Sequence, residues 1–173
     1  TRSLLYFQRE TREYGRVTQT SQSYPVYEYM RSRLARSALL AAWWMSSSTS
    51  GQGIEARSLE VSFVTPNFFE VLGVRPWVGR AFGADDWTGA GEPTAVLTHA
   101  LAVDRFGSAA AAVGQTIPVN GATHTIIGVA PPGFVGPVLR RVDLFVTMQH
   151  GVAAQAGERW ASNPNMRWLQ MVA

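Results

Sequence analysis

The chain of 173 residues contains neither cysteine nor lysine. Without cysteine it can form no disulfide bond and offers no thiol nucleophile. This absence identifies no compartment, because many exported proteins also lack cysteine. All fifteen basic residues are therefore arginines. Compositional bias of the coding sequence explains this most simply. The alternative is a surface for phosphate or carboxylate groups, which the planar guanidinium binds well.

Long apolar runs and charged residues are also scarce. The longest apolar run, from Ala38 to Met45, is far shorter than the ~20 residues that cross a bilayer. Charged residues make up 16% of the chain and hydrophobic residues 46%, with a formal net charge of +3. This balance permits a packed core and argues against global disorder.

Motifs of catalysis and nucleotide binding are missing. The segment Gly79–Gly83 lacks the Gly-Lys-Ser/Thr ending of a P-loop, and no G-x-S-x-G motif occurs. The pair Asp85-Asp86 is more typical of a turn or a helix cap than of catalysis. The serines cluster at Ser46-Ser47-Ser48 in a predicted loop. Three histidines lack the spacing of zinc ligands: His99, His124 and His150. We therefore predict no catalytic residue, no cofactor and no metal, although the sequence leaves a Ser–His–Asp triad open.

Six tryptophans permit two interpretations. They could form a stacking surface for sugars or single-stranded nucleic acid, but packing is the commoner role. Strand-like context predicts core positions for Trp43, Trp44 and Trp168. Loop-like context predicts surface positions for Trp77, Trp87 and Trp160.

The first third of the chain predicts strands around one helix. Leu4–Phe7 is typical of a buried strand, and Thr11–Gln22 is polar and loop-like. Tyr24-Pro25 begins a helix that extends to about Leu34 on its apolar spacing. Leu39–Met45 favours a strand, and the Ser/Gly-rich stretch Ser46–Gly53 predicts a loop.

A half-buried strand and a short capped helix follow. Ile54–Phe63 ends in strict alternation of apolar and polar residues, which is typical of a strand with one buried face. Thr65 is placed to cap a helix over Pro66–Leu72, because proline fits the first helical position. Phe68, Phe69 and Leu72 give this helix an apolar face, and Gly73 follows where a left-handed stop is usual.

The second half predicts short strands, one helix and a hairpin. Thr94–Thr98 favours a strand, and His99–Phe106 a helix that Gly107 ends. Asn120-Gly121 accepts the two positive φ angles of a type I′ turn between two strands. These strands are Gln115–Val119 and Ala122–Val129, and Pro118 marks the first as an edge strand. Two further strands are predicted, Asp143–Thr147 and Arg167–Val172.

The run Phe63–Pro76, followed by Gly79–Phe82, resembles the signature of the MacB-like periplasmic core domain. This domain is the extracytoplasmic part of a class of ABC transporter permeases. Further blocks follow the order of the family: residues 23–29 upstream, then 95–99, 105–107, 113–117, 120–121, 126–134, 143–146 and 167–173.

The alternation of strands and helices predicts an α+β fold. The resemblance implies two small subdomains. A βαβ-type porter-like subdomain would comprise residues 1–92 plus 165–173, and an inserted mixed α/β subdomain residues 93–164. The family pattern continues with another helix, which implies that the first subdomain is incomplete at Ala173. The stretch Gly89–Gly91 predicts the boundary between the two subdomains and a hinge at that point.

The resemblance also implies a function. The expected protein is a non-catalytic periplasmic, extracytoplasmic domain of an inner (cell) membrane permease that contacts a partner or cargo and relays ATPase-driven conformational change. Its implied partners are the parent permease's transmembrane helices, a cytoplasmic ATPase and periplasmic partner proteins, with no nucleic acid. From the residues alone two alternatives stay open: a small secreted hydrolase, and an arginine-rich module that binds polyanions or nucleic acid.

Overall fold

A computed structural model describes residues 9–13, 16–51, 53, 56–87 and 91–173. Its strands are β1 (Arg9–Glu13), β2 (Arg16–Thr20), β3 (Ala41–Ser50), β4 (Arg57–Val64), β5 (Val78–Gly79), β6 (Thr94–Leu97), β7 (Thr116–Val119), β8 (Ala122–Val129), β9 (Leu144–Thr147) and β10 (Gln170–Val172). Its helices are α1 (Tyr24–Leu34), α2 (Phe68–Val71), α3 (His99–Phe106), α4 (Ala109–Ala112), α5 (Met148–Gly151) and α6 (Ala153–Ala156). A 3-10 turn covers Asp85–Trp87.

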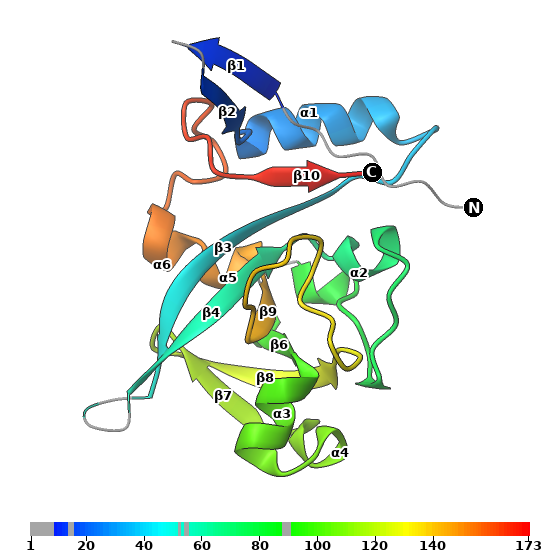
Figure 1. The fold of residues 1–173 in the computed structure, drawn as a ribbon, viewed down its shortest axis with the longest axis vertical. Coiled ribbons are helices and arrows are strands. Elements are labelled where there is room, and N and C mark those ends of the chain that lie inside the picture. The colour runs from blue at the N-terminus through cyan, green and yellow to red at the C-terminus, as the bar shows by residue number, and fades with distance from the viewer. Residues whose placement is uncertain (1–8, 14–15, 52, 54–55, 88–90) are drawn as a thin grey trace.

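One mixed sheet runs through the molecule (Figure 1). Its strand order is β10-β3-β4-β9-β6-β8-β5, and β7 pairs with β8. The pairs β4–β9 and β6–β8 are parallel, and the other neighbours are antiparallel. The α+β fold class is therefore confirmed. Strands from both predicted subdomains belong to this sheet, while the division at residues 92 and 165 stays a prediction.

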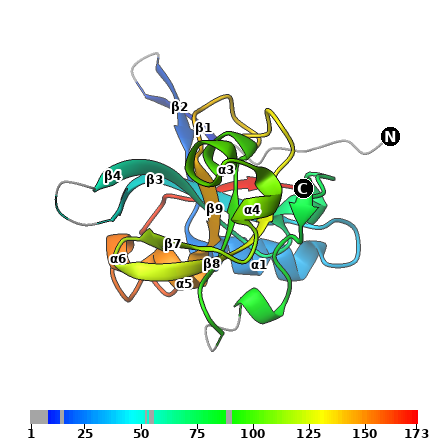
Figure 2. The same cartoon turned by 90° about the horizontal axis from the view of Figure 1, so that it is seen from below.

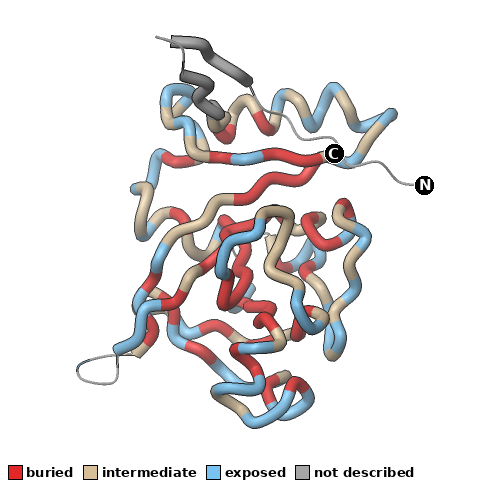
Figure 3. The backbone as a smooth tube through the Cα atoms, in the orientation of Figure 1, coloured by how far each residue is buried: buried red, intermediate tan, exposed pale blue. Residues whose placement is uncertain are grey.

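Each face of the sheet carries its own apolar cluster. One cluster joins alternate residues of the strands to α1, α3, α4 and α5, with Val61 and Leu97 fully buried among them. The other lies under α2 and the segment between β8 and β9, around Phe68, Phe69 and Phe145. Figure 2 shows this segment and helices α5 and α6 on opposite sides of the sheet. Figure 3 shows the buried residues gathered along the central strands.

The N-terminal part departs from the expected loop. Residues 9–13 (β1) and 16–20 (β2) pair as antiparallel strands that lie outside the main sheet. The prediction of a loop over Thr11–Gln22 was wrong, because the β-branched residues in this polar stretch favour extended backbone. They are Thr11, Val17, Thr18 and Thr20. The strand predicted at Leu4–Phe7 lies outside the described residues.

The serine-rich stretch after Met45 belongs to a strand. β3 continues to Ser50, and Ser46, Ser47 and Ser48 pair with residues of β4. The predicted loop at Ser46–Gly53 was therefore wrong up to Ser50. Ser48 and Ser50 are buried while Ser47 and Thr49 are exposed. Side chains therefore alternate between the two faces as in any strand, but small polar residues occupy both faces.

The short helix α2 is correctly located but differently capped. Asn67 is its N-cap residue and makes no side-chain cap bond. Thr65 instead accepts a hydrogen bond from the Ala42 amide (3.1 Å) and donates one to Asn67 Oδ1 (3.0 Å). The predicted threonine cap was wrong, because the buried hydroxyl ties α2 to β3 instead. Gly73 ends the turn with φ +68°, as predicted.

The predicted elements of the second half are confirmed. α3 spans His99–Phe106, and Gly107 ends it in the left-handed conformation. Asn120 and Gly121 have φ angles of +49° and +82°, the signs that a type I′ turn requires. β7, with Pro118, pairs only with β8 and so lies at an edge of the described sheet.

Candidate functional site

Of the residues considered for catalysis, His124 and His150 lie near each other, but no catalytic set forms among the described residues. His99 begins α3, His124 lies in β8 and His150 lies in α5. No group of three or more histidine, aspartate or glutamate residues in the described part of the chain could hold a metal ion. Among the described residues, the only hydrogen bond of a histidine side chain is from His124 Nδ1 to the Ala122 carbonyl (3.2 Å), so no histidine side chain bonds to a serine there.

His124 is nevertheless unusual. The ring is 1% exposed, and Nε2 has no hydrogen-bond partner among the described residues. Burial lowers the pKa of this imidazole to about 4, opposed by the bond to the Ala122 carbonyl and assisted by the nearby His150. His124 is therefore neutral at physiological pH, and it serves as a packed core residue.

The aspartate pair has a structural role, as the turn interpretation predicted. Asp86 is buried and accepts hydrogen bonds from Arg80 (2.6 and 3.1 Å), the Gly83 amide (2.8 Å) and the Thr94 hydroxyl (3.0 Å). Burial by itself would raise the pKa of this carboxyl, but these bonds outweigh it and the pKa lies below its usual value. Asp86 thus fixes the segment that leads from β5 to β6.

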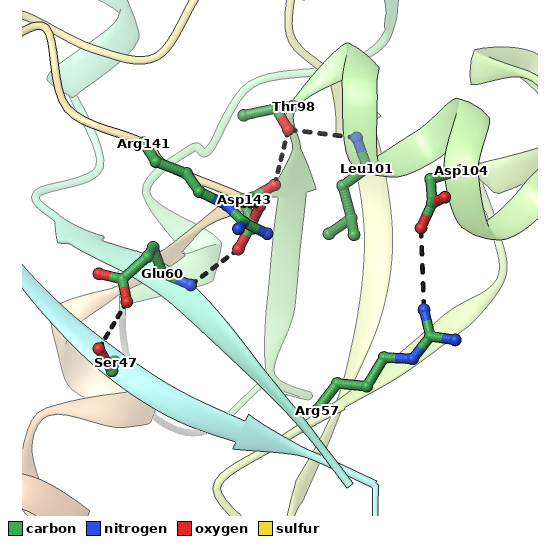
Figure 4. Close-up of polar contacts among 8 residues, drawn as sticks. All are labelled: Ser47, Arg57, Glu60, Thr98, Leu101, Asp104, Arg141 and Asp143. Carbon is green, nitrogen blue, oxygen red and sulfur yellow. Dashed lines mark hydrogen bonds and ion pairs between the residues drawn. The ribbon is translucent and has the colours of Figure 1, made fainter. Parts of the chain in front are cut away.

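The junction of β4, β9 and β6 is held by Asp143 (Figure 4). Its carboxylate accepts from the Glu60 amide (2.9 Å) and from Arg141 Nε (3.1 Å). Its own amide donates to the Glu60 carbonyl (2.8 Å). Its carbonyl accepts from the Thr98 hydroxyl (2.9 Å), which also accepts from the Leu101 amide at the start of α3. One residue therefore connects both predicted subdomains.

A second connection joins the β7–β8 turn to β3. The Asn120 amide donates to the Thr49 carbonyl (2.9 Å), and Asn120 Oδ1 accepts from the Thr49 amide (3.1 Å). Ser48 Oγ accepts from Asn120 Nδ2 (3.1 Å) and from Gln155 Nε2 (2.8 Å). The turn signal in the sequence located Asn120, but nothing in the sequence indicated this second use of its side chain.

A pocket of about 390 Å³ opens between α1, the start of α2 and residues 81–87. No local pattern in the sequence indicates this pocket, because three separate segments form its walls. Gly79 positions the third segment: at φ +77° its Cα lies so close to the Ile127 carbonyl that any side chain would collide. The Arg80–Asp86 pair then fixes the turn that follows.

The tryptophans follow expectation except at Trp160 and at Trp87, which was predicted at the surface but is half-buried against the core. Trp43 is buried, and Trp44 and Trp168 are partly buried against the core, as predicted. Trp77 is 65% exposed, in agreement with a surface position. Trp160 was predicted at the surface, but it is 5% exposed and its ring lies 4.7 Å from that of Tyr24. An irregular segment thus contributes a core residue, which its loop-like sequence did not reveal.

The model of the MacB-like periplasmic core domain matches residues 2–170. The chain belongs to this family. The comparison with curated proteins found no match. In the described part of the chain, no helix is long and apolar enough to span a bilayer.

Solved structures share the fold at low sequence identity. The periplasmic region of MacB from Actinobacillus actinomycetemcomitans is similar with a TM-score of 0.66 and 15% identity, over 88% of this chain and 64% of that one. The extracellular domain of the ABC-type transporter YknZ from Gram-positive bacteria has a TM-score of 0.64 and 14% identity, over 88% of this chain and 73% of that one. A domain of a permease protein from Porphyromonas gingivalis has a TM-score of 0.65 and 14% identity, over 91% of this chain and 64% of that one. The chain therefore spans less than two thirds of the MacB structure.

Proposed function

We propose that this chain is the extracytoplasmic domain of an ABC transporter permease, that it contacts a partner or cargo there, and that it relays movement driven by a cytoplasmic ATPase. The observation that carries the proposal is the family match over residues 2–170. The similarity to the domains of MacB and YknZ supports the fold on which it depends.

The relay is proposed to act through a stiff domain. Main-chain pairing continues from β3 through β4, β9 and β6 to β8, and the Asp143 bonds reinforce the β4–β9 junction. Bending the molecule there would break several buried hydrogen bonds, each of which is costly to leave unmade. The alternative, a hinge at Gly89–Gly91, falls largely on residues 88–90, which lie outside the described part of the chain.

No catalytic role is proposed. The hydrolase alternative needs a nucleophile activated by a base, and no described serine bonds to a histidine side chain; Ser47 donates to the Glu60 carboxylate at an exposed position instead. The polyanion alternative needs unpaired arginines on one face. Four of the eleven arginines whose side chains are described pair with carboxylates, namely Arg31, Arg57, Arg80 and Arg141, and the family match does not favour this alternative.

Side-specific cysteine labelling in cells tests the proposed location. The chain has no native cysteine, so Ala110→Cys on the exposed surface of α4 gives one reactive site in this domain. In the full-length protein, with cysteines elsewhere replaced, a maleimide that crosses the outer but not the inner membrane should label this site without disruption of the inner membrane. A cysteine in the ATPase serves as the control and should react only after permeabilisation. Labelling of position 110 only after permeabilisation would refute an extracytoplasmic location.

A further inference from the structure

The pocket between α1, α2 and residues 81–87 has aromatic walls. Tyr27 on α1 and Phe82 on the third segment are buried beneath its surface, and Trp87 is half-buried at its side. Trp87 also stacks on Tyr24 with a ring separation of 6.4 Å, which holds the indole in place. Pro66 and Ala81 complete an apolar lining. Its volume of about 390 Å³ lies within the range of sites for small organic ligands.

The charged groups of the pocket leave a negative excess. Glu28 accepts from Arg31 (3.2 Å) and from the Tyr24 hydroxyl (3.1 Å), so the one arginine among the described lining residues is already paired. Glu70 is exposed at the pocket and makes no side-chain hydrogen bond or ion pair with any described residue. The charges of Glu28 and Arg31 cancel, and the Glu70 carboxylate remains.

The neutral polar side chain of the lining, Asn67, is largely engaged within the fold. Asn67 Nδ2 donates to the Leu40 carbonyl (2.9 Å), and Asn67 Oδ1 accepts from the Thr65 hydroxyl. The second N–H of this amide has no partner among the described residues, so Asn67 adds one neutral donor and no charge to the lining. A ligand meets apolar surface from Trp87, Pro66 and Ala81 with one free carboxylate beside it, the combination that favours a cation on an apolar body.

We propose that this pocket binds a compact organic cation, in which an ammonium or guanidinium group is attached to an aromatic or aliphatic body. The body lies between Tyr27, Phe82 and Trp87, where it replaces water against apolar surface. The cationic group points to Glu70 and forms a charge-assisted hydrogen bond with its carboxylate. This inference is independent of the proposed relay and of the membrane.

Calorimetric titration of the 173-residue chain with three matched probes tests the proposal. The probes are 2-naphthylmethylammonium, the neutral 2-naphthylmethanol and the anionic 2-naphthoate, which share one aromatic body and differ in charge. The ammonium should bind saturably with one site per chain and at least about threefold more tightly than the alcohol, as expected for one exposed charge pair. Its affinity should fall with added salt, while that of the alcohol should not. Naphthoate should bind more weakly than both.

Two variants locate the site. Glu70→Gln should reduce the ammonium affinity about three- to fivefold and leave the alcohol affinity unchanged, because it removes only the charge. Glu158→Gln, at an exposed position outside the pocket, is the matched control and should change neither affinity. Trp87→Ala should weaken both ligands. If that variant does not fold, Trp87→Phe keeps an aromatic wall and should retain most of the binding.

Three results would overturn the proposal. The first is no saturable binding of the ammonium at millimolar concentration. The second is equal or tighter binding of the alcohol or the naphthoate. The third is an ammonium affinity that Glu70→Gln leaves unchanged. The titration needs neither ATP nor a membrane, so each of these results would leave the transporter proposal intact. Conversely, failure of the cysteine labelling at position 110 would leave the proposed cation site intact.

Discussion

Buried polar side chains carry much of the specificity of this fold. Thr65, Asp86 and Asp143 are each less than a tenth exposed, and each bonds to main-chain or side-chain groups of another segment. His124 differs, because half of its hydrogen-bonding capacity has no partner among the described residues. These residues fix the arrangement of strands, and two of them, His124 and Thr65, each give a stability prediction.

His124 should make the protein acid-sensitive. Its pKa is about 4 in the folded state against 6.5 for an unperturbed histidine, so between these values the unfolded chain binds a proton that the folded chain does not. Stability is therefore highest above pH 6.5, and it should fall by about 3 kcal/mol on acidification to pH 4. Urea unfolding of the chain and of His124→Asn from pH 7.5 to 4 measures this. The unfolding free energy of the variant should depend less on pH over this range. If the free energies of both proteins fall in parallel with pH, the low pKa of His124 would be contradicted.

Phe69 should be among the most sensitive core positions. It is 1% exposed, and its ring lies within 6.0 Å of the rings of Phe68, Phe82, Phe134 and Phe145. Phe69→Ala removes this packing and should cost roughly 3–5 kcal/mol of unfolding free energy. Leu72→Ala, at a half-buried neighbour, is the control and should cost less. If denaturant unfolding shows equally small losses of unfolding free energy for both variants, the aromatic cluster does not form.

Thr65 should contribute through its hydroxyl rather than through a helix cap. Thr65→Val keeps the shape but leaves the Ala42 amide without its acceptor, which should cost about 1–3 kcal/mol. Removal of a cap alone would cost about 1 kcal/mol. Amide hydrogen exchange gives the sharper readout, because protection should fall at Ala42 in β3. Faster exchange confined to the α2 amides would instead restore the cap interpretation.

At the scale of elements, local signals in the sequence were reliable where the backbone needed a particular residue. Gly107 and Asn120-Gly121 adopt the positive φ angles that their positions predicted, and α1 and α3 have the predicted ranges. The two strand segments that were predicted as loops share one cause. β2 and the end of β3 consist mainly of small or polar residues, so their extended backbone was hidden by a lack of apolar alternation.

The β7–β8 turn gives a prediction at this scale. Gly121 has φ +82° and open space around its Cα, so a side chain there is opposed by the backbone conformation and not by a collision. Gly121→Val should destabilise the domain by about 1 kcal/mol or more. Gly121→Asn is the matched control, since asparagine tolerates positive φ and should cost less. An unchanged denaturation midpoint for the valine variant would contradict the turn.

For the whole molecule, the sequence predicted the fold class and the family but not the way that distant segments meet. The parallel pairing of β4 with β9 and the Asp143 bonds join residues about eighty positions apart, and no local pattern indicates such a register. The pocket was missed for the same reason. The sequence did place each wall of it near turns and helix starts, but only the fold brings Tyr27, Glu70 and Trp87 together.

The central claim is that a stiff domain relays ATPase-driven movement. α1 and α4 lie at opposite ends of the long axis (Figure 1), so two labels can separate motion of the domain from motion within it. Exposed positions 33 and 110 provide them, as Arg33→Cys and Ala110→Cys.

The most direct test is the ATP dependence of these label distances in the full-length permease, reconstituted with its ATPase in a bilayer. We expect Mg-ATP to change the distance from position 110 to a fluorescent lipid at the bilayer surface, while the distance between positions 33 and 110 stays constant. A nucleotide-insensitive distance to the bilayer would contradict the relay. A nucleotide-dependent distance between positions 33 and 110 would contradict the stiff domain.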